Sequence, residues 1–141
     1  MKNLLICEPK EIHKDFVVIT IDSKKVTSLR EFYETLATSL YFPDYFGFNM
    51  DSLDELLNDL SWLEDEKIAV YFTNTKSFLI NERSEDKILS LLDMLDAISE
   101  DWKWMEPDED LGPDDDDYIP KKELLFCFED SDEMADLLNK L

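Results

Sequence analysis

The sequence has few glycines, histidines and cysteines for its length of 141 residues. With only Gly47 and Gly112, it has no glycine-rich loop of the kind that cradles phosphate groups. The single histidine, His13, has no neighbouring nucleophile to activate, so nothing indicates acid–base catalysis. Cys7 and Cys127 are too few for a disulfide framework and lie in apolar runs, which indicates buried, reduced thiols. We therefore expect that the protein is not an enzyme and needs no cofactor.

Long hydrophobic runs are also missing. A secretory signal needs an apolar stretch of about 7–15 residues and a membrane span needs about 20. Residues 4–7 are the only apolar run near the start, and Glu8 and Pro9 end it. Together with the reduced thiols, this predicts a cytoplasmic protein that makes no contact with a membrane. The length predicts a single domain over residues 1–141.

Positive charge is scarce, with 14 Lys and Arg residues against 35 Asp and Glu residues, a formal net charge of -21. Such a surface repels the phosphates of nucleic acid and the headgroups of anionic lipid, so neither is expected to bind directly. Apolar residues still make up 44% of the chain and aromatic residues 12%, enough for a folded core. The expected partner is a basic protein.

The strongest concentration of acid lies in residues 106–117, where eight of twelve positions are Asp or Glu and two are proline. No core can hold this segment, so we predict an acidic loop insertion over residues 106–120 that either solubilises the protein or contributes to partner binding. A calcium loop starting at Asp108 would need glycine where Pro113 stands and glutamate where Ile119 stands. No metal site is therefore expected.

Segments rich in β-branched and aromatic residues alternate with amphipathic helices, which predicts an α/β fold. The predicted strands are residues 16–21, 67–72 and 123–128. The predicted helices are residues 29–40, 50–60, a helix beginning at residue 84, and 131–141. Strands separated by helices pair in parallel, so we expect a small three-stranded parallel sheet flanked by helices, with the acidic insertion and a C-terminal helix. Residues 4–7 could add a short strand.

Local patterns predict how these elements begin and what they bury. The continuous β-branched run 16–21 predicts a strand covered on both faces. Ser28, followed three residues later by Glu31, is typical of a capping box at a helix start. The helix that begins at Ser84 has an apolar stripe formed by Ile88, Leu91, Leu92, Leu95 and Ile98.

The predicted helix 50–60 carries the most informative surface. Asn49 is a suitable N-cap for it. Its inward side consists of Met50, Leu53, Leu56, Leu57 and Leu60, and its outward side of Asp51, Asp54, Glu55, Asn58 and Asp59. Four carboxylates thus share one side with no Lys or Arg between them, although like charges four residues apart destabilise a helix. On charge alone, a solvated helix face is the simpler interpretation and a binding surface the alternative.

A distinctive set of residues comprises residues 21–26, Ser28, Phe32 and Leu36, and above all residues 43–53, Pro-Asp-Tyr-Phe-Gly-Phe-Asn-Met-Asp-Ser-Leu. Through this set, residues 16–63 resemble the barstar family of ribonuclease inhibitors. That eleven-residue motif is similar to the family's Pro-acid-Tyr-aromatic-Gly-x-Asn-hydrophobic-Asp-x-Leu signature. The later predicted strands and the long helix fall where the family has its own.

The resemblance implies a three-stranded parallel sheet with helices and an inhibitor that blocks a ribonuclease active site. It implies that Tyr45 is a contact tyrosine, Asp51 the first helix carboxylate, and Glu55 the main anchor that takes the place of an RNA phosphate. Asp54 stands where the family has a contact tryptophan, and Met94 where it has a contact glutamate. These differences point to a ribonuclease or toxin other than barnase.

We therefore expect an intracellular immunity protein that blocks the active site of a cognate basic ribonuclease or nuclease toxin with an acidic helix. The residues expected to contact that partner are Tyr45, Asn49, Asp51, Asp54, Glu55, Asn58 and Asp59. Two alternatives stay open. The protein could be an acidic interaction module for a basic protein that is not a nuclease, or a nucleic-acid mimic that occupies a DNA-binding protein.

Overall fold

Four parallel strands form the sheet of the computed structural model, which describes residues 3–106, 110, 112 and 121–141. The strands are β1 (Leu4–Ile6), β2 (Val17–Asp22), β3 (Lys67–Thr73) and β4 (Glu123–Phe128). They lie in the order β1-β4-β3-β2, and every neighbouring pair is parallel. β3 and β4 are therefore the two central strands.

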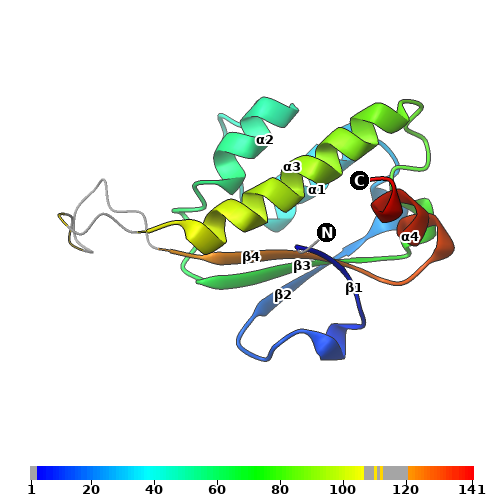
Figure 1. Cartoon of the computed structure of the whole chain (residues 1–141). Helices are drawn as coiled ribbons and strands as arrows, with labels where there is room; N and C mark the ends of the chain where they lie inside the picture. Colours follow the sequence, from blue (N-terminus) through cyan, green and yellow to red (C-terminus); the bar gives the residue numbers. More distant parts are fainter. Residues whose placement is uncertain (1–2, 107–109, 111, 113–120) are drawn as a thin grey trace.

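The α-helices of the described residues are α1 (Leu29–Ser39), α2 (Met50–Leu57), α3 (Glu85–Trp104) and α4 (Asp132–Asn139). Single 3-10 turns are η1 (Pro9–Glu11), η2 (Ser23–Lys25) and η3 (Thr75–Ser77). Figure 1 shows α1, α2 and α3 on one side of the sheet, with α3 running along it. The connection between β1 and β2 lies on the opposite side, and α4 packs beside the end at which β4 finishes.

The core fills the space between the sheet and its helices. β3 is buried from Ile68 to Phe72, because a central strand is covered by neighbours on both edges and by chain on both faces. Phe72 stacks between Phe32 of α1 and Phe128 of β4, with ring centroids 5.9 and 5.1 Å away. Aromatic rings of three elements thus join helix to sheet at the centre of the molecule.

The sequence predicted three strands, whereas the sheet has four. The predicted parallel α/β arrangement is confirmed. β1 adds a fourth strand at the edge, where Leu4 pairs with Phe126 and Ile6 with Phe128. Three residues are too few to give a clear strand pattern. Their place is fixed by pairing with β4, more than a hundred residues further along the chain.

The expectation that β2 is covered on both faces is also wrong. β2 is an edge strand, and Val17 and Val18 keep 42% and 39% of their surface exposed. Ile21 near the end of the strand is buried against the helices. A β-branched run favours a strand wherever it lies, so the run alone does not distinguish an edge strand from a central one.

The predicted helix starts at Ser28 and Ser84 are confirmed, but the predicted capping box is only half formed, because the Glu31 carboxylate accepts from the backbone N–H of Thr27. Ser28 Oγ accepts a hydrogen bond from the backbone N–H of Glu31, and Ser84 Oγ accepts one from Lys87. All five residues of the apolar stripe predicted for α3 are buried. The C-terminal helix α4 is shorter than expected, because it begins after its N-cap Ser131 and ends at Asn139.

The strand order brings the two cysteines together, although they are 120 positions apart in the sequence. Both cysteines are free thiols. Cys127 is buried as predicted and Cys7 is half-buried. Burial raises the pKa of the Cys127 thiol to about 12 and also raises the pKa of Cys7, so both favour the neutral form.

Most of the acidic insertion predicted at residues 106–120 lies outside the described residues, and only Glu106, Asp110 and Gly112 fall within them. All three are exposed. No helix in the part of the chain that the structure describes combines the length and apolar character needed to cross a membrane.

Candidate partner-binding face

The loop between α1 and α2, residues 40–49, buries one aromatic side chain and leaves its neighbour exposed. Phe46 is 6% exposed and packs edge-to-face on Phe42 and Tyr33, at centroid distances of 4.9 and 6.2 Å. Tyr45, its neighbour, is 66% exposed. Phe46 therefore holds the loop to the core, and Tyr45 is left available at the surface.

The same loop is tied to the first turn of α2. The backbone N–H of Gly47 donates to Ser52 Oγ at 2.9 Å, and Asn49 Nδ2 donates to the carbonyl oxygen of Gly47 at 3.1 Å. A Cβ added at Gly47 would lie 3.0 Å from Asn49 Nδ2, closer than side chains normally approach. Glycine at this position thus allows the loop to close against the helix.

Asn49 is the N-cap of α2, as predicted. Its Oδ1 accepts a hydrogen bond of 2.8 Å from the backbone N–H of Ser52, which satisfies one of the free donors at the helix start. Asp51 lies in the first turn, where a carboxylate is stabilised by the helix dipole. The cap fixes where the helix begins and hence the direction in which its acidic side points.

α2 separates its two sides as the sequence pattern predicts. Leu53, Leu56 and Leu57 are buried. The opposite side, here called the acidic face of α2, consists of the exposed residues Asp51, Asp54, Glu55 and Asn58. The predicted interface residues Tyr45 and Asn49 are exposed as well, so the structure makes six of the seven predicted contact residues accessible.

The predicted extent of the helix to Leu60 is wrong, because α2 ends at Leu57. Asn58 forms the C-cap, and its Nδ2 donates to the carbonyl oxygen of Asp54 at 2.8 Å and to Asp54 Oδ1 at 2.9 Å. Leu60 then takes a left-handed backbone conformation with φ 50°. Asp59 consequently lies beyond the helix, half-buried, and its Oδ1 accepts a hydrogen bond from the N–H of Ser61. It is the one predicted contact residue that is not fully exposed.

Two tryptophans that the sequence analysis did not single out fix the helix ends. Trp102 Nε1, on α3, donates to the carbonyl oxygen of Leu57 at 2.9 Å. Trp62 Nε1 donates to the carbonyl oxygen of Leu40, just after α1, at 2.8 Å. Both indoles satisfy carbonyls that have no partner within their own helix. The position of Trp102, four residues after Ile98 in the apolar stripe of α3, is the signal that could have identified it.

Among the described residues, no Lys or Arg forms an ion pair with a carboxylate of the acidic face of α2. Asp65 and Glu66, which lie beyond this face, interact with the buried Lys122. Arg30 of α1 lies 5.4 Å from the ring centroid of Phe48, but its Nε pairs with Glu34 at 2.9 Å. The negative charge of the acidic face is therefore uncompensated.

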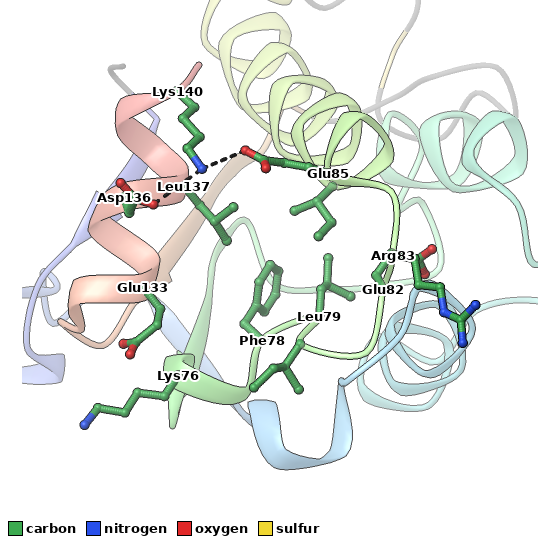
Figure 2. A pocket seen from close by; sticks show the side chains of 12 residues that line it. Lys76, Phe78, Leu79, Glu82, Arg83, Glu85, Glu133, Asp136, Leu137 and Lys140 are labelled. Atoms are coloured by element: carbon green, nitrogen blue, oxygen red, sulfur yellow. Dashed lines mark ion pairs between the residues drawn. The ribbon is translucent and has the colours of Figure 1, made fainter.

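A groove beside the start of α3 also contains acidic residues, but two of them form ion pairs. It has a volume of about 360 Å³, and its floor includes the buried Phe78 and Leu79 (Figure 2). Lys140 Nζ lies 2.7 Å from Glu85 Oε1 and 3.4 Å from Asp136 Oδ2 at its rim. The hydrogen bond with Glu85 contributes most to raising the pKa of Lys140. Glu85 and Asp136 are thus paired with a lysine of the chain, whereas no carboxylate of the acidic face of α2 forms an ion pair among the described residues.

A family model described as barstar (barnase inhibitor) matches residues 16–114, more than half of the chain. The chain belongs to the barstar family. The resemblance predicted from residues 43–53 is thereby confirmed, and the match includes the whole loop and α2. Barstar proteins are inhibitors of ribonucleases rather than enzymes. No curated protein matches the chain.

Proposed function

We propose that this protein is a cytoplasmic immunity protein that inhibits a cognate basic ribonuclease toxin by placing the acidic face of α2 in its active site. The two free thiols support a reducing compartment. We further propose that residues 1–141 act as one domain with the acidic insertion at residues 106–120. The protein is proposed to act by binding alone, with no chemistry of its own.

The observation that carries this proposal is the uncompensated charge around α2. Asp51 and Glu55 have no hydrogen-bond or ion-pair partner among the described side chains, and the helix that bears them is held at both ends. A helix held at both ends loses little backbone freedom when its carboxylates bind a partner. In a barstar-family protein, that arrangement supports a preformed binding surface over a merely solvated helix.

The proposed mechanism follows from the charge of the target. A ribonuclease groove needs cationic side chains to hold the RNA phosphates, and carboxylates form strong charge-assisted hydrogen bonds with the same groups. Glu55 would take the position of a phosphate, with Asp51 and Asp54 beside it and Tyr45 packing at the rim. The net charge of -21 would also accelerate encounter with a basic protein, and added salt would reduce this effect.

The test is an inhibition titration against barnase and against the basic ribonucleases of the same cell. We expect one of these enzymes to lose activity in proportion to added protein, with full inhibition at one equivalent. Glu55→Lys is expected to abolish the inhibition. Asp130→Lys is the matched control, since Asp130 is exposed, follows β4 and has no partner among the described residues.

Three outcomes would contradict the proposal. Equal loss of inhibition in both variants would mean that total charge matters rather than α2. Salt-sensitive binding to a basic protein without any inhibition would indicate an acidic interaction module. Displacement of DNA from a DNA-binding protein, with no effect on any ribonuclease, would indicate a nucleic-acid mimic.

A further inference from the structure

A small cavity lies where the C-terminal ends of α2 and α3 meet. Its volume is about 160 Å³, and we call it the notch; it is lined by Asn58, Asp101, Trp102 and Met105. A cavity of this volume accepts a group of about the size of a benzene ring, and it is too small for a peptide segment. Asn58 belongs to the acidic face of α2, so the notch continues that face onto α3.

The polar atoms left free in the notch are acceptors. Both donors of the Asn58 amide are used, because Nδ2 donates to the carbonyl oxygen and to Oδ1 of Asp54. The Trp102 indole N–H is used by the carbonyl of Leu57. This leaves Asn58 Oδ1 and the exposed carboxylate of Asp101, neither of which has a partner among the described residues.

The surroundings of the notch also favour a cation. α2 ends at Leu57 and α3 at Trp104, so the negative ends of two helix dipoles lie beside the notch, and Lys121 caps one carbonyl of α3 only. Lys103 and Lys121, which lie near the end of α3, do not line the notch. Lys103 lies 3.9 Å from Glu100, and Lys121 Nζ donates to the carbonyl oxygen of Lys103 at 3.0 Å.

We propose that the notch binds one arginine side chain of the basic partner, with its guanidinium group on Asp101 and Asn58 and its aliphatic stem on Met105. A guanidinium carries five N–H donors and no acceptor, which complements a site that offers acceptors only. Its planar group can bind a carboxylate with two parallel hydrogen bonds, and it is more weakly hydrated than an ammonium group. The identity of the partner rests on the function proposed above, but the chemistry of the notch does not.

The direct test uses an arginine probe rather than the partner. N-acetyl-arginine amide is titrated into the ¹⁵N-labelled full chain, and N-acetyl-citrulline amide serves as the uncharged isostere. We expect saturable shifts at the Asn58 side-chain amide and the Trp102 indole with the arginine probe only. Asp101→Asn should weaken the binding about tenfold. Asp93→Asn, an exposed carboxylate on the same helix, should leave it unchanged.

The proposal is overturned if the arginine probe shifts acidic residues evenly without saturation, or if Asp101→Asn binds as tightly as the unaltered chain. The same two variants are then compared as inhibitors of the ribonuclease that the unaltered chain inhibits. Asp101→Asn should raise the inhibition constant about tenfold and Asp93→Asn should not. Absence of inhibition by the unaltered chain would reject the proposed function and leave the probe titration to decide on the notch.

Discussion

Trp102 and Leu57 are joined by a 2.9 Å hydrogen bond from the indole N–H to the backbone carbonyl oxygen, although 45 positions separate them. The bond ties α3 to the last residue of α2. Trp102 is 3% exposed, so solvent does not compete for the bond. Together with the Asn49 cap at the other end, it fixes α2 relative to the sheet, and hence the direction of its carboxylates.

Replacing the indole tests this link. Trp102→Phe keeps an aromatic ring in the core but leaves the carbonyl of Leu57 without its donor. We expect the free energy of unfolding to fall by about 1–3 kcal/mol in urea denaturation, the cost of an unsatisfied buried polar group. Trp104→Phe is the control, because Trp104 is 76% exposed. Its effect should stay within about 0.5 kcal/mol; equal effects would contradict a specific role for Trp102.

Lys122 is a buried cation that holds the segment after α2. It is 2% exposed, and its Nζ donates to the carbonyl oxygens of Leu63 and Asp65 at 2.9 and 2.7 Å. Burial lowers the pKa of its ammonium group. Lys122→Met should reduce the free energy of unfolding by about 1–3 kcal/mol, because two carbonyls lose their donor. The adjacent exposed Lys121 offers the control Lys121→Met, for which a comparable loss would refute the assignment.

The lowered pKa of Glu31 predicts how the free energy of unfolding changes with pH. Its Oε1 accepts hydrogen bonds from the hydroxyl and from the backbone N–H of Thr27, and these hold the pKa of Glu31 below its ordinary value of 4.5. A carboxyl whose pKa is lower in the folded chain stabilises the fold above pH 4.5 and loses that contribution as pH falls through the folded value.

The measurement is urea unfolding at a series of pH values. Glu31→Gln should be less stable than the unaltered chain above pH 4.5, with the difference shrinking as the pH falls further. Thr27→Val, which removes the hydroxyl donor, should shift the loss of stability to higher pH. A difference that stays constant through the acid range would mean that Glu31 has the same pKa in both states.

The neighbouring aromatic residues Tyr45 and Phe46 should separate binding from stability. Tyr45→Ala removes a side chain that is 66% exposed and should change the free energy of unfolding by less than about 0.5 kcal/mol. It should weaken inhibition at least about tenfold if Tyr45 packs against the partner. Phe46→Ala, at 6% exposure, should cost about 3–5 kcal/mol of stability. A large loss of stability in Tyr45→Ala would show that Tyr45 serves the fold instead.

Local sequence patterns correctly predicted those features of the fold that depend on contacts within a few helical turns. The Ser28 cap, the Asn49 cap and the buried stripe of α3 depend on residues within a few turns of one another. The strand β1 and the exposed edge of β2 depend on strand order, which arises from contacts between distant parts of the chain. The early end of α2 coincides with the C-cap Asn58, whose backbone N–H and Nδ2 both donate to the carbonyl of Asp54, and with the left-handed backbone of Leu60.

Only part of the candidate site could be predicted from the sequence. Helical periodicity placed Asp51, Asp54 and Glu55 together on the outward side, where the structure has them. The contact of Trp102 on α3 with the end of α2 was missed, because Trp102 lies far from α2 in the sequence. That the described acids of the α2 face form no ion pair could also not be derived, since it depends on which carboxylates the few Lys and Arg residues reach in the folded chain.

Competition with a nucleotide tests whether the acidic face of α2 occupies the phosphate-binding site of a ribonuclease. The ribonuclease that this protein inhibits is titrated with it in a calorimeter at increasing concentrations of a nucleotide 3′-monophosphate. We expect the apparent dissociation constant to rise in proportion to the nucleotide concentration, because the two ligands exclude each other. Unchanged affinity at saturating nucleotide, with all three molecules in one complex, would rule out binding at the phosphate site.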